Sequence, residues 1–168
     1  MSTSSVRVVP AGEDRRPTLE HLVQLYLHDL SGVGGWDLRA DGTFGTELLD
    51  GCWSETRRHS FLFQVGDSLA GFAVVDRGSH VSDRADVWDM AEFFVVKRWR
   101  RAGVGRSAAR QLFATFPGAW KVRTFPGYVP AEKFWPSVCA DMASSDVVTV
   151  ADQRRSRPGG QIIRFLVG

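Results

Sequence analysis

Apolar positions recur with two different periods along this chain. Residues 18–30 carry apolar side chains three or four positions apart, which predicts an amphipathic helix. Two apolar runs at residues 61–65 and 69–75 flank a Gly-Asp-Ser turn at 66–68, the pattern of a tight β-hairpin. Residues 87–96 form a third apolar run that suits a buried strand. These runs predict a helix followed by three strands.

The remaining pattern alternates between short strands, helices and loops. Residues 31–45 hold five glycines and predict a loop with weak local order, while residues 76–86 are polar and rich in turn formers. Further runs predict strands at 6–9, 120–124, 147–150 and 162–167, helices at 105–116 and 131–139, and a helical turn at 47–53. The element order has neither an internal repeat nor a linker, so we expect one mixed α/β domain over residues 1–168.

Composition narrows the class of protein. A chain of 168 residues fits one domain, and a hydrophobic fraction of 43% with 24% charged residues is that of an ordinary globular protein. The net charge of +2 does not point to nucleic acid. No apolar stretch approaches 18 residues, and the first residues lack the apolar segment of a signal peptide. We therefore expect no membrane span and a cytoplasmic protein.

The cysteines and histidines do not form a recognisable metal or redox motif. Cys52 and Cys139 have no Cys or His at ligand spacing, so neither a disulfide framework nor a zinc site is expected. Cys139 ends an apolar helical pattern, and we interpret it as a small core residue rather than a reactive thiol. The four histidines are scattered along the chain. The sequence therefore predicts a protein without a metal.

One segment carries more chemical information than the rest of the chain. Between residues 93 and 109 an apolar run ends in positive charge, and Gly103 and Gly105 then stand one residue apart where a helix begins. Glycines let backbone N–H groups approach an anion closely, and a helix N-terminus directs its positive dipole end to the same place. The segment therefore predicts a phosphate site. The side chains that can neutralise the phosphate charge are Arg100, Arg101 and Arg106.

Basic residues are concentrated in this segment, where six Lys and Arg side chains fall within the fourteen positions 97–110. A solvated basic helix face or a nucleic-acid patch would have the same composition. In either of these the glycine spacing would be accidental, so a phosphate site is the favoured interpretation.

Three strand–loop–helix patterns bind phosphates, and spacing separates them. A P-loop needs a Lys directly after its last glycine, and none follows here. A dinucleotide fingerprint fits Gly103, Gly105 and Ala108, but basic residues stand about 20 positions on, where it requires an acidic one. The pattern Arg/Gln-x-x-Gly-x-Gly/Ala fits Arg100, Gly103 and Gly105 directly after a strand. This third pattern resembles the acyl-CoA pyrophosphate loop of the GNAT superfamily of N-acetyltransferases.

The resemblance covers roughly residues 60–140. Residues 92–105 are similar to the family's Glu-Leu-x-Val-x-Pro-x-Tyr-Arg-Gly-x-Gly-x-Gly, with Lys97 in place of Pro and Trp99 in place of Tyr. The apolar runs at 61–75 resemble the hairpin that precedes this motif. The fold that the resemblance implies is α/β, with a single mixed, mostly antiparallel, splayed sheet flanked by helices.

A second motif of the family, the helix Asn-x-x-Ala-x-x-Phe-Tyr beside the CoA arm, resembles residues 128–135. Tyr128 stands in place of its Asn, and Trp135 in place of the Tyr that usually serves as general acid. Indole N–H cannot give up a proton at useful pH, so Tyr128 is the candidate acid and Ser137 a lesser one. Alternatively, the thiolate leaves into solvent. Phe134 is expected to face the core, with Trp135 packing on pantetheine.

The resemblance implies acyl transfer from acetyl-CoA, or another acyl-CoA, to an amine. The main chain of the strand before the phosphate loop would pair with pantetheine and stabilise the developing oxyanion. Glu92 is the candidate general base, or a residue that binds the substrate ammonium. Asp89 is weaker, because a regular strand turns it to the opposite side of the sheet. The expected donor-binding residues are Phe94, Val95, Val96, Arg100, Arg101, Ala102, Gly103, Val104, Gly105, Arg106 and Trp135.

Three classes of function stay open. Two motifs in the correct order favour an acyl-CoA N-acyltransferase acting on a small-molecule amine in a ternary complex. The missing Tyr leaves room for an acyl-carrier-protein or aminoacyl-tRNA donor, or for a non-catalytic CoA-binding domain. The basic cluster leaves a nucleic-acid or protein-binding module. The expected partners are a small-molecule amine, no membrane, and nucleic acid only as an aminoacyl-tRNA donor, for a monomer or a homodimer.

Overall fold

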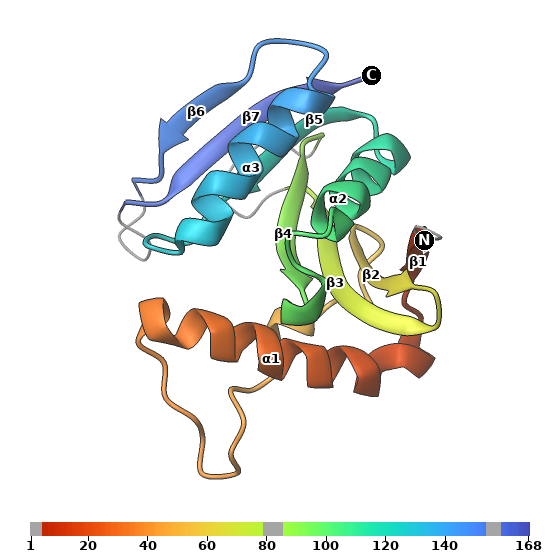
Figure 1. Ribbon diagram of the computed structural model, residues 1–168, viewed down its shortest axis with the longest axis vertical. Coiled ribbons are helices and arrows are strands. Elements are labelled where there is room, and N and C mark those ends of the chain that lie inside the picture. Colours follow the sequence, from red (N-terminus) through yellow and green to blue (C-terminus); the bar gives the residue numbers. More distant parts are fainter. Residues whose placement is uncertain (1–4, 79–85, 154–158) are drawn as a thin grey trace. The chain divides into compact units, whose positions relative to one another are not determined.

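The computed structural model describes residues 5–78, 86–153 and 159–168. Its strands form one seven-stranded sheet in the order β1-β2-β3-β4-β5-β7-β6 (Figure 1). Within the chain, contacts divide into two compact units. Unit 1 comprises Met1–Val74 and Glu92–Ala108, and unit 2 comprises Val75–Ala91 and Ala109–Gly168. Strands β3 (Ser68–Arg77) and β4 (Trp88–Val95) therefore contribute residues to both units.

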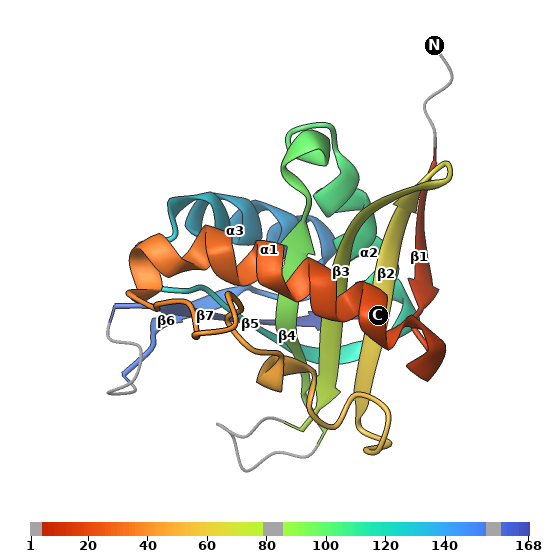
Figure 2. The ribbon, with the colours of Figure 1, turned by 90° about the horizontal axis from the view of Figure 1, so that it is seen from below.

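Unit 1 is built on the predicted hairpin and the first helix. Strand β1 (Val6–Pro10) pairs antiparallel with β2 (Arg58–Val65), and β2 continues into β3. Helix α1 (Arg16–Gly34) crosses these strands in Figure 2 and buries Leu19, Leu22, Val23 and Leu30, the apolar stripe that its spacing predicts. Short 3₁₀ helices η1 (Glu13–Arg15) and η2 (Glu47–Leu49) lie before and after it in the chain.

Helix α1 runs four residues beyond its predicted end at residue 30. The glycines that predict a loop there do not stop it until Gly35, whose φ of 66° is left-handed and whose N–H bonds to Ser31 O at 2.8 Å. Glycine adopts this conformation without steric cost, so it is a common helix end. The other predicted helices and strands agree with the observed bounds to within three residues, and the predicted turn at 47–53 is reduced to η2.

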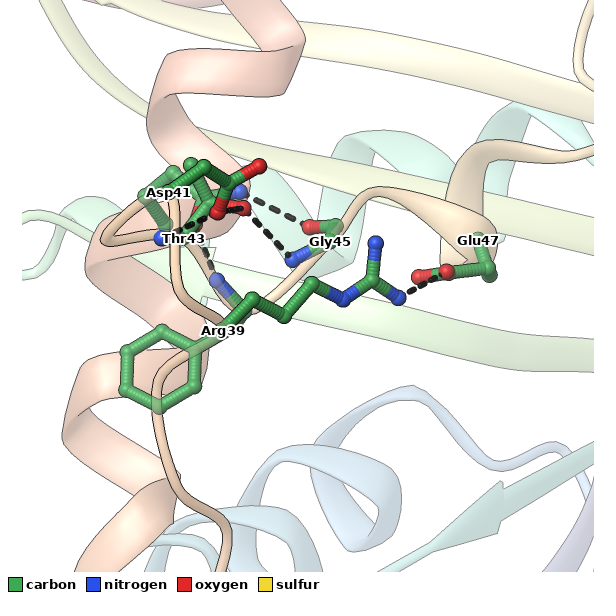
Figure 3. Close-up of polar contacts among 7 residues, drawn as sticks. Arg39, Asp41, Thr43, Gly45 and Glu47 are labelled. Atoms are coloured by element: carbon green, nitrogen blue, oxygen red, sulfur yellow. Dashed lines mark hydrogen bonds and ion pairs between the residues drawn. The ribbon is translucent and has the colours of Figure 1, made fainter.

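The loop after α1 is more ordered than its composition predicts (Figure 3). Asp41 Oδ1 accepts hydrogen bonds from the Thr43 N–H at 3.0 Å and the Thr43 hydroxyl at 2.8 Å. Gln24 on α1 bonds the main chain at both Phe44 and Gly45, each at 2.8 Å. Polar side chains therefore order part of this loop. In the other predicted turn-rich segment, residues 76–86, residues 79–85 lie outside the described part of the chain.

Unit 2 packs the remaining strands beside two helices. Strand β5 (Gly118–Arg123) is parallel to β4 and antiparallel to β7 (Gln161–Val167), and β7 pairs in turn with β6 (Val148–Ala151). Helix α3 (Val129–Met142) packs beside β7. The aromatic core centres on Phe113, which meets Trp120 and Phe165 edge to face with ring centroids 4.7 and 5.1 Å apart.

The sheet confirms the predicted fold class. Its only parallel pairing among the described register pairs joins β4 to β5, through Trp88, Asp89 and Met90. Strand β4 runs five residues further, so its last residues are not part of that ladder. A mixed, mostly antiparallel and splayed sheet is therefore observed.

Candidate functional site

Strand β4, the following loop and helix α2 (Val104–Thr115) form the strand–loop–helix that the sequence predicts, and the phosphate-site part lies within unit 1. The strand ends at Val95, and the next N–H, of Val96, bonds to Ala70 O on β3 at 2.8 Å. A 3₁₀ turn, η3 (Lys97–Trp99), leads into the loop. The bond from Ser107 N–H to Gly103 O, at 2.9 Å, closes the first turn of α2. At a helix N-terminus the first N–H groups point along the helix axis, toward where an anion can bind.

Two residues of the loop adopt left-handed backbone conformations. Gly103 has φ of 80°, and Arg101 has φ of 61°, the one non-glycine residue with positive φ in the described chain. Arg101 stands where the family pattern has a glycine. Left-handed residues alternating with right-handed ones turn successive N–H groups to one side, which makes a concave site for an anion. The loop conformation therefore suits a phosphate group and carries strain at Arg101.

The surface of the loop fits an anion in charge and in space. Residues 101–103 are exposed, and the sequence has no acidic side chain from 97 to 110. A Cβ added to Gly103 would meet nothing within 4 Å, so the space above this residue is open to a ligand. Val104 is 4% exposed and anchors the start of α2 in the core. A rigid helix start below an open, cationic loop is what a pyrophosphate requires.

The end of β4 lies unusually close to β3. A Cβ on Gly71 of β3 would overlap the carbonyl oxygen of Phe94 on the neighbouring strand, so only glycine fits at this position. Phe94 is buried against Tyr26 and Phe72, with ring centroids 5.7 and 6.0 Å away, whereas Phe93 packs on Phe63. Val95 and Val96 are half-buried. Sequence reasoning missed Gly71, which lies inside an apolar strand pattern, where a lone glycine signals a close backbone approach.

Arg100 does not extend into the loop. Its Nε donates a hydrogen bond to Val95 O at 2.7 Å, and its Nη2 forms an ion pair with Asp29 Oδ2 on α1. The guanidinium also lies over the Phe94 ring, 5.5 Å from its centroid. Arg101 is exposed and Arg106 is half-buried beside the loop. Of the three arginines predicted to neutralise phosphate, Arg100 therefore binds other residues of the protein.

The two carboxylates of β4 have different surroundings. Glu92 is half-buried in unit 1, two residues before Phe94. Asp89 is 2% exposed in unit 2, where its Oδ2 accepts from Arg123 Nη2 at 2.9 Å and lies 3.4 Å from Lys121 Nζ. Both cations belong to β5, so Asp89 links β4 to β5 within unit 2 through these contacts. These ion pairs are a structural role for Asp89, which the sequence analysis ranks below Glu92 as a candidate general base.

Tyr128 and Trp135 belong to unit 2. Tyr128 is half-buried and immediately precedes α3. Trp135 is 5% exposed and packs on Phe113 and Phe134, with ring centroids 6.4 and 4.9 Å away. Phe134 itself is only half-buried, so the expected division of faces is wrong: Trp135 is the core residue. Its larger ring fills the gap beside Phe113, which outweighs the family pattern.

Neither a metal centre nor a reactive thiol is found in the described part of the chain. No group of three or more His, Cys, Asp or Glu side chains there is placed to hold a metal ion. Cys52 and Cys139 are both buried, and burial raises the pKa of the Cys139 thiol to about 12 from an ordinary 9.0. A thiol at this pKa stays protonated near neutrality, which agrees with a core role. Among the described helices, none combines the length and the apolar content needed to cross a membrane.

Comparison with known proteins identifies the fold but not the sequence family. No family profile matches the chain, and no curated protein is significantly similar to it in sequence. An acetyltransferase from Thermus thermophilus is similar in structure, with a TM-score of 0.72 and 15% identity over 99% of this chain and all of that one. A GNAT-family acetyltransferase from Staphylococcus aureus has a TM-score of 0.65 and 11% identity, over 98% of this chain and all of that one.

A third similar structure was solved with ligands. The spermidine N-acetyltransferase from Vibrio cholerae, in complex with CoA and spermine, has a TM-score of 0.64 and 7% identity, over 98% of this chain and 96% of that one. Identities this low establish architecture alone. With its splayed sheet and strand–loop–helix, the chain has the fold of the GNAT acetyltransferases.

Proposed function

We propose that this protein is an N-acyltransferase that moves an acetyl or other acyl group from acyl-CoA to an amine. The observation that carries the proposal is the loop between β4 and α2, where left-handed Arg101 and Gly103 precede a helix start in a segment, residues 97–110, that contains no acidic residue. This geometry provides main-chain donors for a pyrophosphate. The GNAT fold supports the proposal, because the acetyltransferases named above share it.

Binding of the donor is assigned to two parts of unit 1. The main chain of residues 101–106 holds the pyrophosphate, with Arg101 and Arg106 supplying nearby positive charge. The main chain of Phe94, Val95 and Val96 lies beyond the β4–β5 ladder and is proposed to run beside pantetheine. Val96 N–H is bonded to Ala70 O and Val95 O to Arg100 Nε, so pairing with the pantetheine amides is assigned to the other main-chain groups of this segment. A bound acyl-CoA would present its thioester carbonyl to an N–H of this strand.

The reaction joins the amine nitrogen to the acyl carbon and breaks the carbon–sulfur bond. Glu92 takes the proton that the amine loses, directly or through water, and a strand N–H stabilises charge on the carbonyl oxygen. Glu92 is half-buried on β4, two residues before Phe94, on the strand that is assigned to the donor. If Glu92 instead binds the substrate ammonium, the proton passes to solvent before attack.

The departing thiolate needs a proton at some stage. We assign this to Tyr128 or to solvent, because Trp135 cannot act as an acid and is buried in the core of unit 2. The expected contact between Trp135 and pantetheine stays a prediction. Replacing Tyr128 with Phe separates the two routes: an unchanged alkaline limb of the pH–rate profile assigns the proton to solvent, and a loss of that limb assigns it to Tyr128.

The acceptor is proposed to be a small-molecule amine. The complex of the spermidine N-acetyltransferase contains spermine, a polyamine, and this ligand is a property of that protein only. The GNAT fold also leaves acyl-carrier-protein and aminoacyl-tRNA donors as alternatives. A non-catalytic CoA-binding domain is the second candidate function, favoured by the absence of Tyr at residue 135.

Thermal unfolding with and without acetyl-CoA tests donor binding. A ligand at 100 times its dissociation constant stabilises the folded state by about 2.7 kcal/mol, so a clear rise in Tm is expected. Gly103→Ala should abolish most of this rise, because its methyl group enters the open space above the loop. Alanine is preferred to valine, since φ of 80° strains a β-branched residue severely. If acetyl-CoA raised the Tm of this variant as much as that of the wild type, the phosphates would bind elsewhere. Turnover with amines then distinguishes an enzyme from a non-catalytic CoA-binding domain.

A further inference from the structure

We infer that Asp29 and Arg100 are positioning residues that hold the end of β4 in place for the donor, and that Arg100 is not a phosphate ligand. The inference rests on the proposed function and reassigns one arginine of its loop motif. It concerns unit 1 alone, because Asp29 on α1 and Arg100 after η3 both belong to it.

The contacts of Arg100 all point back into the protein. One edge of its planar guanidinium serves two acceptors at once: Val95 O, 2.7 Å from Nε, and the Asp29 carboxylate. The plane of the group covers the Phe94 ring at 5.5 Å. Val95 and Phe94 lie at the end of β4, before the phosphate loop, and Asp29 lies on α1. The arginine therefore fixes the last carbonyl of the strand that the proposal assigns to pantetheine.

Helix α1 supplies the other side of the contact. Asp29 lies one turn after Tyr26, so the two side chains share a face of the helix. Tyr26 packs edge to face on Phe72 and tilted on Phe94, each with ring centroids 5.7 Å apart. The same helix face thus holds β4 by an aromatic contact and by an ion pair. The side chains of Arg100 and Asp29 are 31% and 27% exposed, which shields the pair partly from solvent.

A positioning role and a phosphate role predict opposite effects for one substitution. If Arg100 binds phosphate, Asp29 competes for it, and Asp29→Asn should release the guanidinium and tighten donor binding. If Arg100 positions Val95, the same substitution weakens its anchor and loosens donor binding. Arg100→Lys also separates the two, because lysine binds phosphate as a point charge but cannot serve two acceptors with a planar fork.

The experiment is calorimetric titration of acetyl-CoA into the full-length wild type and the variants Asp29→Asn and Arg100→Lys. We expect each variant to bind about tenfold more weakly, the usual effect of losing one charge-assisted hydrogen bond. The matched control is Glu20→Gln, which removes the same charge from α1 at an exposed pair with Arg16. It should stay within about twofold of wild type, as exposed pairs contribute little.

Acetyl-pantetheine, which lacks the phosphates, provides a second readout. The positioning role predicts that both variants lower kcat/KM for acetyl-CoA and for acetyl-pantetheine by the same factor. Effects confined to acetyl-CoA, or a tighter complex with Asp29→Asn, would overturn the inference. Melting of the free variants checks their folding, and if one is unfolded the other decides. A wild type that binds no acetyl-CoA would instead overturn the proposed function.

Discussion

Arg101 is the residue at which this loop departs most clearly from its pattern. It holds φ of 61°, a conformation that costs a non-glycine residue on the order of 1 kcal/mol. An exposed arginine in this state reduces the stability of the protein and, under the proposed function, adds positive charge beside the pyrophosphate. The proposal therefore predicts that stability and donor binding are in conflict at this side chain.

Replacing Arg101 with glycine is expected to raise the free energy of unfolding by about 1 kcal/mol, because it relieves left-handed strain. The same change should weaken acetyl-CoA binding, since one cation near the phosphates is lost. Urea denaturation and calorimetry measure the two effects on one sample. Arg101→Ala is the control: it removes the charge but keeps the strain, so binding should fall without any gain in stability. A glycine variant less stable than wild type would contradict the strain.

Glu92 is the residue on which the proposed proton transfer depends. Glu92→Gln should lower kcat by about 10²–10⁴-fold while leaving acetyl-CoA affinity nearly unchanged, because the amide keeps the shape but cannot accept a proton. The acidic limb of the pH–rate profile should flatten. Steady-state kinetics across pH measures both the fall in kcat and the flattening of the acidic limb. Asp89→Asn is not a suitable control, because it would disturb the buried ion pairs of Asp89. A rise in the KM of the amine alone would make Glu92 a binding group.

At the scale of elements, the close contact between Gly71 of β3 and the end of β4 holds the main chain that the proposal assigns to the donor. Gly71→Ala should lower the free energy of unfolding by roughly 1–3 kcal/mol and weaken donor binding, because the new methyl group pushes the Phe94 carbonyl aside. Chemical denaturation and titration with acetyl-CoA measure these effects. Gly32→Ala is the matched control: nothing lies within 4 Å of its added Cβ in α1, so it should stabilise by about 1 kcal/mol. Equal effects of the two substitutions would remove the special role of Gly71.

Local patterns predicted most elements because their causes are local. The apolar spacing of α1, the turn at 66–68 and the glycines of the phosphate loop each act within a few residues. The order of the loop after α1 depends instead on Gln24, which reaches Phe44 and Gly45 about 20 positions along the chain. Only its Asp41–Thr43 turn has a spacing that could have been recognised beforehand.

The same division holds for the candidate site: features set by neighbouring residues are predictable from sequence, and contacts between distant residues are not. The strand–loop–helix is predictable from its glycines, since their conformational freedom is a property of sequence, and phosphate binding by this loop stays a prediction. The contacts of Arg100 with Asp29 and of Gly71 with Phe94 join residues far apart in the chain, so no motif records them. The spacing along α3 predicts a core position for Phe134, whereas the buried residue is its neighbour Trp135, because the core contacts of unit 2 are not recorded in the helix spacing.

For the molecule as a whole, burial of Cys139 links stability to alkaline pH. Its pKa is raised to about 12 when folded, against an ordinary 9.0, so the unfolded chain loses this proton first as pH rises. The contribution is fully present below pH 9 and is lost on the way to pH 12, at up to about 1.4 kcal/mol per pH unit. Urea denaturation from pH 8 to 10.5 should show this decline, and Cys139→Ala should make it shallower. Equal slopes would show that Cys139 ionises in the folded state.

Product formation tests the central claim most directly. Wild-type protein is incubated with acetyl-CoA and a panel of polyamines, amino acids, drug-like amines and peptides with free N-termini, and mass spectrometry follows the amines while a thiol reagent follows free CoA. The account predicts that at least one amine gains an acetyl group in step with thiol release, and that Glu92→Gln nearly abolishes both. Binding of acetyl-CoA without any acylated amine across the panel would contradict it and identify a CoA-binding domain without transferase activity.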